Sequence, residues 1–249
     1  MEGARVLKNS QIIILGICIA AATVAASVIL SQGFLKVMKF TREQISVTGS
    51  AQRDIRSDLA VWTASFSRRE AAAADAYRKL KEDLAKVRKY LVAKGVKESD
   101  IIIFQVGTKQ IFRKNDKGND TSDIEGYLLT QSVQVKSAEV DLVTRVSMES
   151  TELIDQGIEF SSGAPEYYYT KLDELKVEML AKATQNAKLR AENMTRATGN
   201  RIGLMRSARM GVFQITPVNS TEVSDWGVND TSSLEKKVTA VVNVSFAIE

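Results

Sequence analysis

Histidine is absent from the 249 residues, and cysteine occurs once, as Cys18. Without histidine, the chain can form no Ser-His-Asp triad, no Cys-His dyad and no zinc site built on Cys and His. A single cysteine excludes an intramolecular disulfide, so folding does not depend on an oxidising compartment. These absences remove the commonest catalytic and metal-binding arrangements, and we expect neither a metal nor another cofactor.

The charge of the chain is unevenly distributed. It carries 34 basic and 30 acidic residues, a net charge of +4. Five of the basic residues and one of the acidic residues lie in residues 1–42, so the remainder carries 29 of each sign. A neutral body of mixed charges binds a phosphate backbone poorly, so we expect no nucleic-acid partner. The basic residues beside the N-terminal apolar run suit anionic lipid headgroups instead.

The longest apolar run extends from Ile12 to Leu30 and contains no charge. As a helix, it would be roughly 28 Å long, close to the ~30 Å hydrocarbon core of a bilayer. The sequence predicts a tail over residues 1–11, a transmembrane anchor over residues 12–35 that binds the bilayer, and a linker over residues 36–44. The alternative is a cleaved signal peptide, but the run exceeds the usual signal core and its small-x-small triplets are weak cleavage sites. Basic residues on both sides leave the orientation open, while the short tail favours translocation of the body.

Residues 45–249 show strand-like and helix-like patterns in turn. Apolar residues at three- and four-residue steps predict a long helix from Ala73 to Leu91, another from Leu172 to Thr198, and a short helix after Ser137. The spacing Ser67-x-x-Glu70 matches a capping box for the first of these helices, and Gly95 matches a C-cap. Period-two alternation predicts strands at residues 45–51, 59–68, 101–112, 126–136, 157–160, 202–213 and 238–248.

Hairpin connections dominate this order of elements. The strands at 101–112 and 126–136 flank a polar turn region and predict a long antiparallel hairpin. We therefore predict an α+β fold in which an N-terminal transmembrane helix precedes a mostly antiparallel sheet, with two long helices and one short helix packed on it. Residues 214–237 are polar and aperiodic, and a loop of that length is usually functional, disordered or an assembly element.

Several of these segments, in this order and spacing, resemble the SIMPL-domain family, a bacterial domain of unknown function. The resemblance covers residues 45–249, which we interpret as one SIMPL-like domain. It rests on the opening strand Ile45-Ser46-Val47-Thr48-Gly49, on Asp58-Leu59-Ala60, on Lys94-Gly95-Val96 followed by Ser99-Asp100-Ile101, and on Gly126-Tyr127. Ser57 departs from the proline that the family usually has before this aspartate. The resemblance implies an extracytoplasmic or membrane-attached envelope protein, linked to stress and surface antigens, and some family members assemble into large homo-oligomeric rings. It supplies no catalytic residues.

Two aromatic features stand out in the body. Tyr167, Tyr168 and Tyr169 are consecutive, so their side chains diverge and cannot share one core. Trp226 is the only aromatic residue of the polar stretch from Gln214 to Lys237. Tyrosine and tryptophan are enriched at protein interfaces, so all four residues are candidates for an oligomer interface. Ordinary half-buried packing within one chain is the other interpretation.

Three other groups of residues carry weaker signals. Five carboxylates are candidates for acid–base chemistry, although most such residues are surface charges or caps: Asp54, Asp58, Glu70, Asp155 and Glu159. Asp116, Asn119 and Asp120 lack the spacing of a calcium loop, so we expect a plain hairpin turn there. The glycines of residues 199–203 end a helix and lead into a strand, whereas a phosphate-binding loop needs the opposite order.

These observations predict a membrane-anchored, non-enzymatic protein that forms a large homo-oligomeric assembly of the cell envelope, with a stress-related role. We expect a single pass through the bacterial inner membrane and an extracytoplasmic body. One alternative is a channel-like or transport component, in which gathered N-terminal helices line a pore that includes Thr23 and Ser27. Another is an enzyme that uses a pair of the carboxylates named above.

Overall fold

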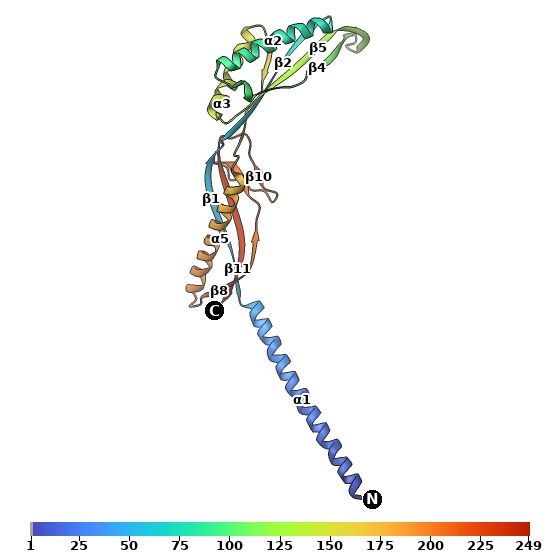
Figure 1. Ribbon diagram of the computed structural model, residues 1–249, viewed down its shortest axis with the longest axis vertical. Helices are drawn as coiled ribbons and strands as arrows, with labels where there is room; N and C mark the ends of the chain where they lie inside the picture. Colours follow the sequence, from blue (N-terminus) through green and yellow to red (C-terminus); the bar gives the residue numbers. More distant parts are fainter. Residues whose placement is uncertain (1) are drawn as a thin grey trace. The chain divides into compact units, whose positions relative to one another are not determined.

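The computed structural model describes residues 2–249, and it describes side chains at residues 14–36, 38 and 43–249 (Figure 1). Met1 of the predicted tail lies outside the described residues. The side chains of Arg5, Lys8, Lys39 and Arg42, on which the prediction of orientation depends, lie outside them as well.

The N-terminal apolar run forms helix α1 (Glu2–Arg42). Within it, Ile14–Lys36 is long and apolar enough to cross a membrane. Its 23 residues make a helix of about 35 Å, slightly longer than the hydrocarbon core. Helices of this kind at an N-terminus serve both as single-pass anchors and as signal sequences. The helix also includes residues 36–42 of the predicted linker.

The chain divides into two compact units. The first contains residues 1–50, 182–211 and 241–249, and the second contains residues 51–181 and 212–240. Strands β1 (Gln44–Arg56) and β11 (Glu235–Ile248) and helix α5 (Leu172–Arg196) contribute residues to both. The strands are mostly antiparallel and the helices lie on them, so the predicted α+β class is confirmed.

The sheet of the first unit has β11 between β1 and β8 (Ile202–Met210). The ladder between β11 and β8 is antiparallel and runs from Val242 opposite Met210 to Ile248 opposite Ile202. Helix α5 lies on one face of this sheet and buries alanines at four-residue steps, Ala183, Ala187 and Ala191. Helix α5 and strand β1 approach closely because Gly49 has no side chain.

The second unit is built around two long strands, β2 (Leu59–Glu70) and β5 (Asp120–Ser137). They pair antiparallel from Ala60 opposite Ser137 to Glu70 opposite Tyr127. Four shorter strands extend this sheet: β3 (Ile101–Ile103) and β4 (Gly107–Lys114) on β5, and β6 (Glu159–Ser162) and β7 (Glu166–Tyr168) on β2. Near β11, the same unit holds β9 (Gln214–Pro217), which pairs with β11, and β10 (Val228–Asn229), which pairs in parallel with β9.

Helix α2 (Ala73–Ala93) contacts β2 and β5, and α3 (Val140–Glu149) packs beside it (Figure 1). The 3-10 turn η1 (Glu98–Asp100) and the one-turn helix α4 (Glu152–Asp155) complete the unit. The side chains buried between helices and sheet include Leu80, Val87 and Leu91 of the predicted stripe of α2, whereas Tyr77 of that stripe is 54% exposed. The largest of them are Trp62, Phe66, Leu80, Leu91, Leu153, Ile158, Val87, Val133 and Val135. Gly95 has a φ of 99° after the end of α2, so the predicted C-cap is confirmed.

The predicted capping box at Ser67 and Glu70 is wrong, because strand pairing overrides the local signal. Ser67 and Glu70 lie in β2, and α2 begins at Ala73 without a side-chain cap, so there is no capping box. Instead, Ser67 Oγ donates to Glu159 Oε2 at 2.8 Å, and Glu70 pairs with Lys79. The sequence predicts a strand at residues 59–68 and a helix cap formed by Ser67 and Glu70. Pairing with β5 instead keeps the chain in the sheet as far as Glu70.

The predicted strand at residues 101–112 is interrupted at Phe104. The Phe104 amide donates to Ser132 O, and the buried side chain of Gln131 donates through Nε2 to Phe104 O at 2.9 Å. The Gln131 side chain thus takes the place of a backbone hydrogen bond between strands, at the point where β3 ends and before β4 begins. The polar stretch 214–237 is also more ordered than predicted, because it contains β9, β10 and the first residues of β11.

Candidate functional site

The three consecutive tyrosines lie in and after β7, and their side chains diverge as expected. Tyr167 is buried, and its hydroxyl shares a 2.9 Å hydrogen bond with Thr144 Oγ1 of α3. Tyr168 is exposed, and its hydroxyl donates to Glu166 Oε2 at 2.6 Å, which raises the pKa of Tyr168. Tyr169 is half-buried. Only Tyr168 and part of Tyr169 therefore remain available to a partner.

The loop between β9 and β10 presents two apolar side chains to solvent. Trp226 is 94% exposed and Val223 is 78% exposed. Glu222 and Asp225 lie beside them and are also exposed. From Met210 to Leu234 the chain contains no lysine or arginine. The tip of this loop is thus apolar and acidic.

The base of the loop is held in place by the buried side chain of Gln214. Its Nε2 donates to Ser224 O at 2.6 Å, and its Oε1 accepts from the Val228 amide at 2.9 Å. One amide group thus connects both sides of the turn that carries Trp226. The Gly227 amide also donates to Ser224 O at 3.1 Å.

Gly227 itself is required by this turn. Its φ is 86°, in the left-handed region that favours glycine, and a Cβ there would lie 2.8 Å from Phe213 O. The backbone on which Trp226 is exposed therefore has a defined shape. Ordering it costs little additional conformational entropy when a partner binds.

A buried lysine links this loop to the tyrosine segment. Lys236 is 2% exposed, and its Nζ donates to Tyr167 O at 2.6 Å and to Asp230 O at 2.5 Å. The Tyr167 amide donates to Thr231 O at 2.7 Å. The structure therefore brings together the two segments that carry the predicted interface residues.

Burial lowers the pKa of Lys236, and the nearby Asp230 carboxylate opposes that shift. Burial alone would raise the pKa of Asp230. Hydrogen bonds from Ser232 and Ser233 and the charge of Lys236 outweigh that effect, so the pKa of Asp230 lies below its ordinary value. The hydrogen bonds of the Lys236 Nζ to Tyr167 O and Asp230 O hold the end of the loop against β7.

Sequence analysis did not identify Gln214 or Lys236 as important. A signal for Lys236 was available, because alternation along β11 places it on the same face as buried Val238, Ala240 and Val242. A lysine at a buried strand position needs acceptors. Gln214 carries no comparable signal, since its two partners are backbone groups of a loop.

The candidate carboxylates are not gathered into one site. Asp58 accepts from the Thr170 amide at 2.7 Å and from the Thr170 hydroxyl at 2.9 Å. Glu70 pairs with Lys79, and Glu159 accepts from Ser67. The side chains of Asp54 and Asp155 are exposed. Asp54, Asp58 and Asp155 thus have separate surroundings, whereas Glu70 and Glu159 both lie near enough to Arg68 to raise its pKa.

Two further patterns have the structures that were expected. The Asn115 side chain accepts from the amides of Lys117 and Asn119 at 3.0 Å, which closes a hairpin turn between β4 and β5. Gly199 has a φ of 78°, and the Asn200 amide donates to Thr195 O, so this segment is a helix C-cap. Among the residues searched within the described part of the chain, no group of three or more His, Cys, Asp or Glu could hold a metal ion.

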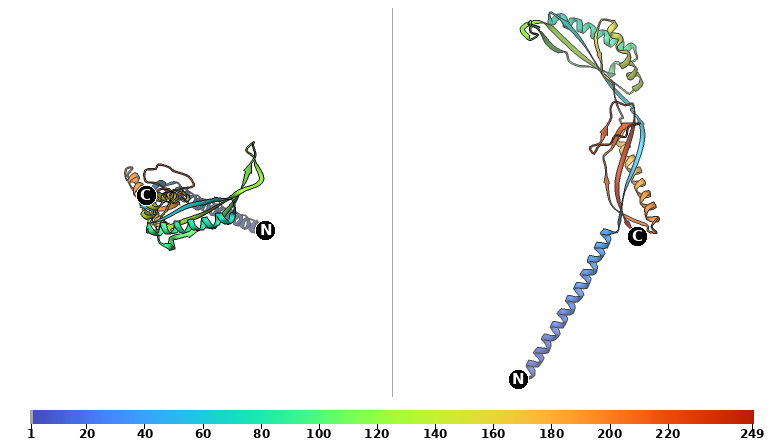
Figure 2. Two further views of the ribbon diagram at one scale, coloured as in Figure 1. Left: turned by 90° about the horizontal axis from the view of Figure 1, so that it is seen from above. Right: turned by 180° about the vertical axis from the view of Figure 1, so that it is seen from behind.

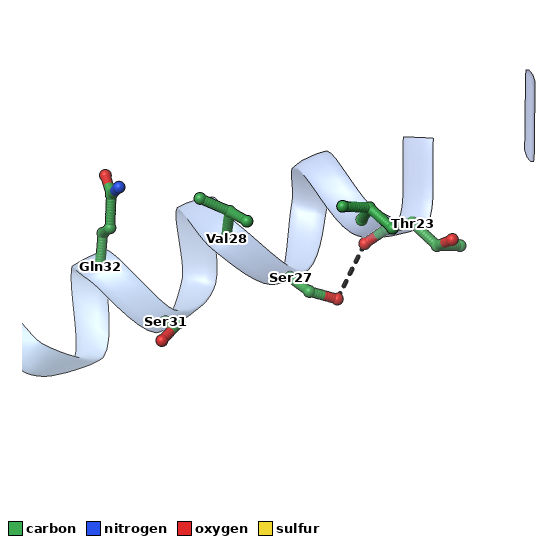
Figure 3. Close-up of a pocket in the computed structure, with 6 residues that line it drawn as sticks. Thr23, Ser27, Val28, Ser31 and Gln32 are labelled. Atoms are coloured by element: carbon green, nitrogen blue, oxygen red, sulfur yellow. Dashed lines mark hydrogen bonds between the residues drawn. The ribbon is translucent and has the colours of Figure 1, made fainter. Parts of the chain in front are cut away.

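Helix α1 carries a row of polar side chains in its apolar span (Figure 3). Thr23, Ser27, Val28, Ser31 and Gln32 line a shallow groove along it. Thr23 Oγ1 donates to Ala20 O, and Ser27 Oγ donates to Thr23 O, both at 2.8 Å. Because both hydroxyl groups donate to carbonyl groups of the same helix, neither leaves an unpaired donor. This part of α1 can therefore contact either lipid or a second helix.

Comparison with known proteins identifies one family. The family model SIMPL, described as a protein of unknown function (DUF541), matches residues 45–246. No curated protein matches the chain. The match covers nearly the whole predicted SIMPL-like domain, including both segments that meet at Lys236. The chain, with its N-terminal helix long enough to span a membrane, belongs to the SIMPL family.

Proposed function

We propose that this SIMPL protein is a membrane-anchored, non-enzymatic assembly protein, in which the loop bearing Trp226 contacts a neighbouring copy. One observation carries the proposal: a tryptophan that is 94% exposed stands on a loop whose backbone is held by Gln214 and Lys236. Exposing an indole to water is unfavourable, and burying a large apolar side chain contributes about 1.5–3 kcal/mol. A rigid loop with an exposed aromatic residue is what an interface hot spot requires.

The anchor strengthens this proposal. Copies held by α1 in one bilayer share a thin layer, so their effective concentration is far higher than in solution. Contacts that are weak between free domains can then produce a large homo-oligomer. The candidate carboxylates Glu70 and Glu159 have structural partners, Lys79 and Ser67, which supports a non-enzymatic role. The neutral body supports a function without nucleic acid.

The test is the mass of the detergent-solubilised chain, by size-exclusion chromatography with light scattering. We expect the wild type to be oligomeric and Trp226→Ala to weaken each contact by about 2 kcal/mol, a ~30-fold loss of affinity. Tyr77→Ala is the matched control, because Tyr77 is an exposed aromatic residue of α2 in the same unit. A wild type that is monomeric at every working concentration would refute the proposal.

The cellular setting is part of the same proposal. We place α1 in the bacterial inner membrane with the body outside the cytoplasm, and we assign the assembly a stress-related role in the envelope. The family resemblance supports this placement. Protease added to spheroplasts should digest residues 45–249, whereas protection of the body until the cells are lysed would place it in the cytoplasm.

The row of polar residues on α1 favours a second candidate, a channel-like assembly. If α1 helices gather around an axis with Ser27 and Ser31, which lie on one side of the helix in Figure 3, facing inward, the assembly would have a polar lumen. Planar bilayers containing the full chain would then conduct ions, and a Ser27→Leu, Ser31→Leu variant would conduct less. An absence of conductance with an intact oligomer would leave the architectural function alone.

A further inference from the structure

Strand β8 is the less protected edge of the sheet in the first unit. Within the described residues, β8 pairs with β11 alone. β11 lies between β8 and β1 in this sheet, and α5 lies beside β1 in Figure 1 and in the right view of Figure 2. Natural proteins usually cover or charge such edges, because unpaired strands attract other chains.

Helix α5 bonds backbone groups of β1, whereas much of β8 is exposed to solvent. The Arg190 side chain donates from Nη1 to Thr48 O at 3.0 Å, and Asn186 Oδ1 accepts from the Ser50 amide at 3.2 Å. A Cβ on Gly49 would lie only 2.2 Å from Ala183 O, so the helix backbone lies directly over β1.

The exposed part of β8 is apolar and basic. Leu204 is 76% exposed, Met205 is 55% exposed and Met210 is 62% exposed. Arg209 is exposed as well and lies opposite Asn243, on the other face of the sheet from Met205 and Met210, and residues 200–213 contain no acidic residue. Met205 and Met210 lie opposite buried Phe246 and Val242, so they occupy the helix-bearing face without being covered by the helix.

The tip of the loop bearing Trp226 has the complementary composition. It combines exposed Trp226 and Val223 with exposed Glu222 and Asp225, and no basic residue lies between Met210 and Leu234. Methionine adapts its shape and makes favourable contacts with aromatic rings. Opposite charges beside an apolar contact favour this pairing over contacts between like surfaces.

We infer that the loop tip, residues 221–226, of one copy docks on strand β8 of a second copy. This inference rests on the proposed self-association and names the surface that receives Trp226. Trp226 and Val223 cover the side chains of Met205 and Met210, and Asp225 lies near Arg209. A β8–β8 contact between copies is disfavoured, because it would bring arginines of the two strands together. The contact joins two different surfaces, so it is head-to-tail and closes into a ring when the rotation between copies allows it.

Charge exchange tests this docking in the full-length chain in detergent. Arg209→Glu alone and Asp225→Arg alone should each reduce the oligomeric fraction about tenfold at a fixed concentration, in line with ~1.4 kcal/mol per contact. The double variant should recover most of the loss, since the pair is restored with reversed signs. Lys117→Glu, an exposed basic position in the hairpin turn, is the matched control and should change nothing. Salt should weaken the wild-type oligomer, because the charges are at the surface.

A direct contact is tested by Trp226→p-benzoylphenylalanine and irradiation of a mixture of unlabelled and 15N-labelled chains. We expect crosslinks between labelled and unlabelled chains that map to residues 202–213. Crosslinks within one chain, or to another surface of the second copy, would overturn the inference. If the wild type is oligomeric but charge exchange has no effect, the docking surface is wrong and self-association stands. If the wild type is monomeric, the proposed function itself fails.

Discussion

The contact between α5 and β1 depends on the missing side chain of Gly49, and Gly49→Ala tests it. A Cβ at this position would lie 2.2 Å from Ala183 O, 2.5 Å from Ala187 N and 2.6 Å from Ala187 Cβ. All three distances are shorter than real Cβ contacts, and two of the atoms belong to the helix backbone. The substitution therefore cannot be accommodated by rotating a side chain, and α5 must move away from the sheet.

The expected loss of stability in Gly49→Ala follows from overpacking. Forcing extra atoms into a packed interface costs about 1–3 kcal/mol, and a clash with helix backbone belongs at the upper end. Replacing glycine with alanine in a strand returns about 0.5–1 kcal/mol through the unfolded chain. We expect a net destabilisation of about 2 kcal/mol, which lowers the melting temperature by on the order of 5–10 °C.

The assay is thermal unfolding of the detergent-solubilised chain, followed by circular dichroism. Gly203→Ala is the matched control in the same unit, because the three atoms nearest to its Cβ belong to the Glu249 side chain, which can rotate away. We expect this control to melt within about 2 °C of the wild type, since flexible surface contacts change stability by less than ~0.5 kcal/mol. Equal melting temperatures for Gly49→Ala and Gly203→Ala would refute the close packing of α5 on β1.

Two further predictions concern buried charges of the second unit. Asp83→Ala removes the buried carboxylate that accepts two hydrogen bonds from Arg68, and it should destabilise the unit by about 2–3 kcal/mol in urea unfolding. A change below ~0.5 kcal/mol would show that this pair does not stabilise the fold. Burial lowers the pKa of Lys236, so the unfolded chain binds its proton more tightly than the folded chain does. Stability should therefore rise as the pH increases from the folded pKa towards the ordinary value of 10.5, and Lys236→Met should lack that rise. Urea unfolding of the wild type and of Lys236→Met at about pH 7.5 and pH 10 measures this rise in stability. The same pH dependence in both proteins would contradict a lowered pKa of Lys236.

The sequence predicted only part of the candidate contact surface. Trp226 stood out because it is the only aromatic residue in a long polar stretch, and its exposure agrees with an interface role. The three tyrosines were treated alike, but Tyr167 is a core residue that bonds Thr144 of α3. Alternation along a strand predicts that neighbours diverge, whereas the choice of which one is buried depends on the elements packed on each face.

Periodicity alone determined the class of this protein. An uncharged apolar run of helix-spanning length, two helical stripes and several alternating strands are local properties, and they led to the α+β class and to an N-terminal helix long enough to span a membrane. The family was identified from short motifs in their order along the chain. The tertiary structure decided the rest, because it depends on partners far apart in the chain. Pairing of β2 with β5 placed Ser67 and Glu70 in a strand, and the side chain of Gln131 split a predicted strand in two. Burial of Lys236 joined the tyrosine segment to the loop bearing Trp226, and α5 packed directly over Gly49 of β1. No local pattern encodes those contacts, since each arises only when distant segments meet.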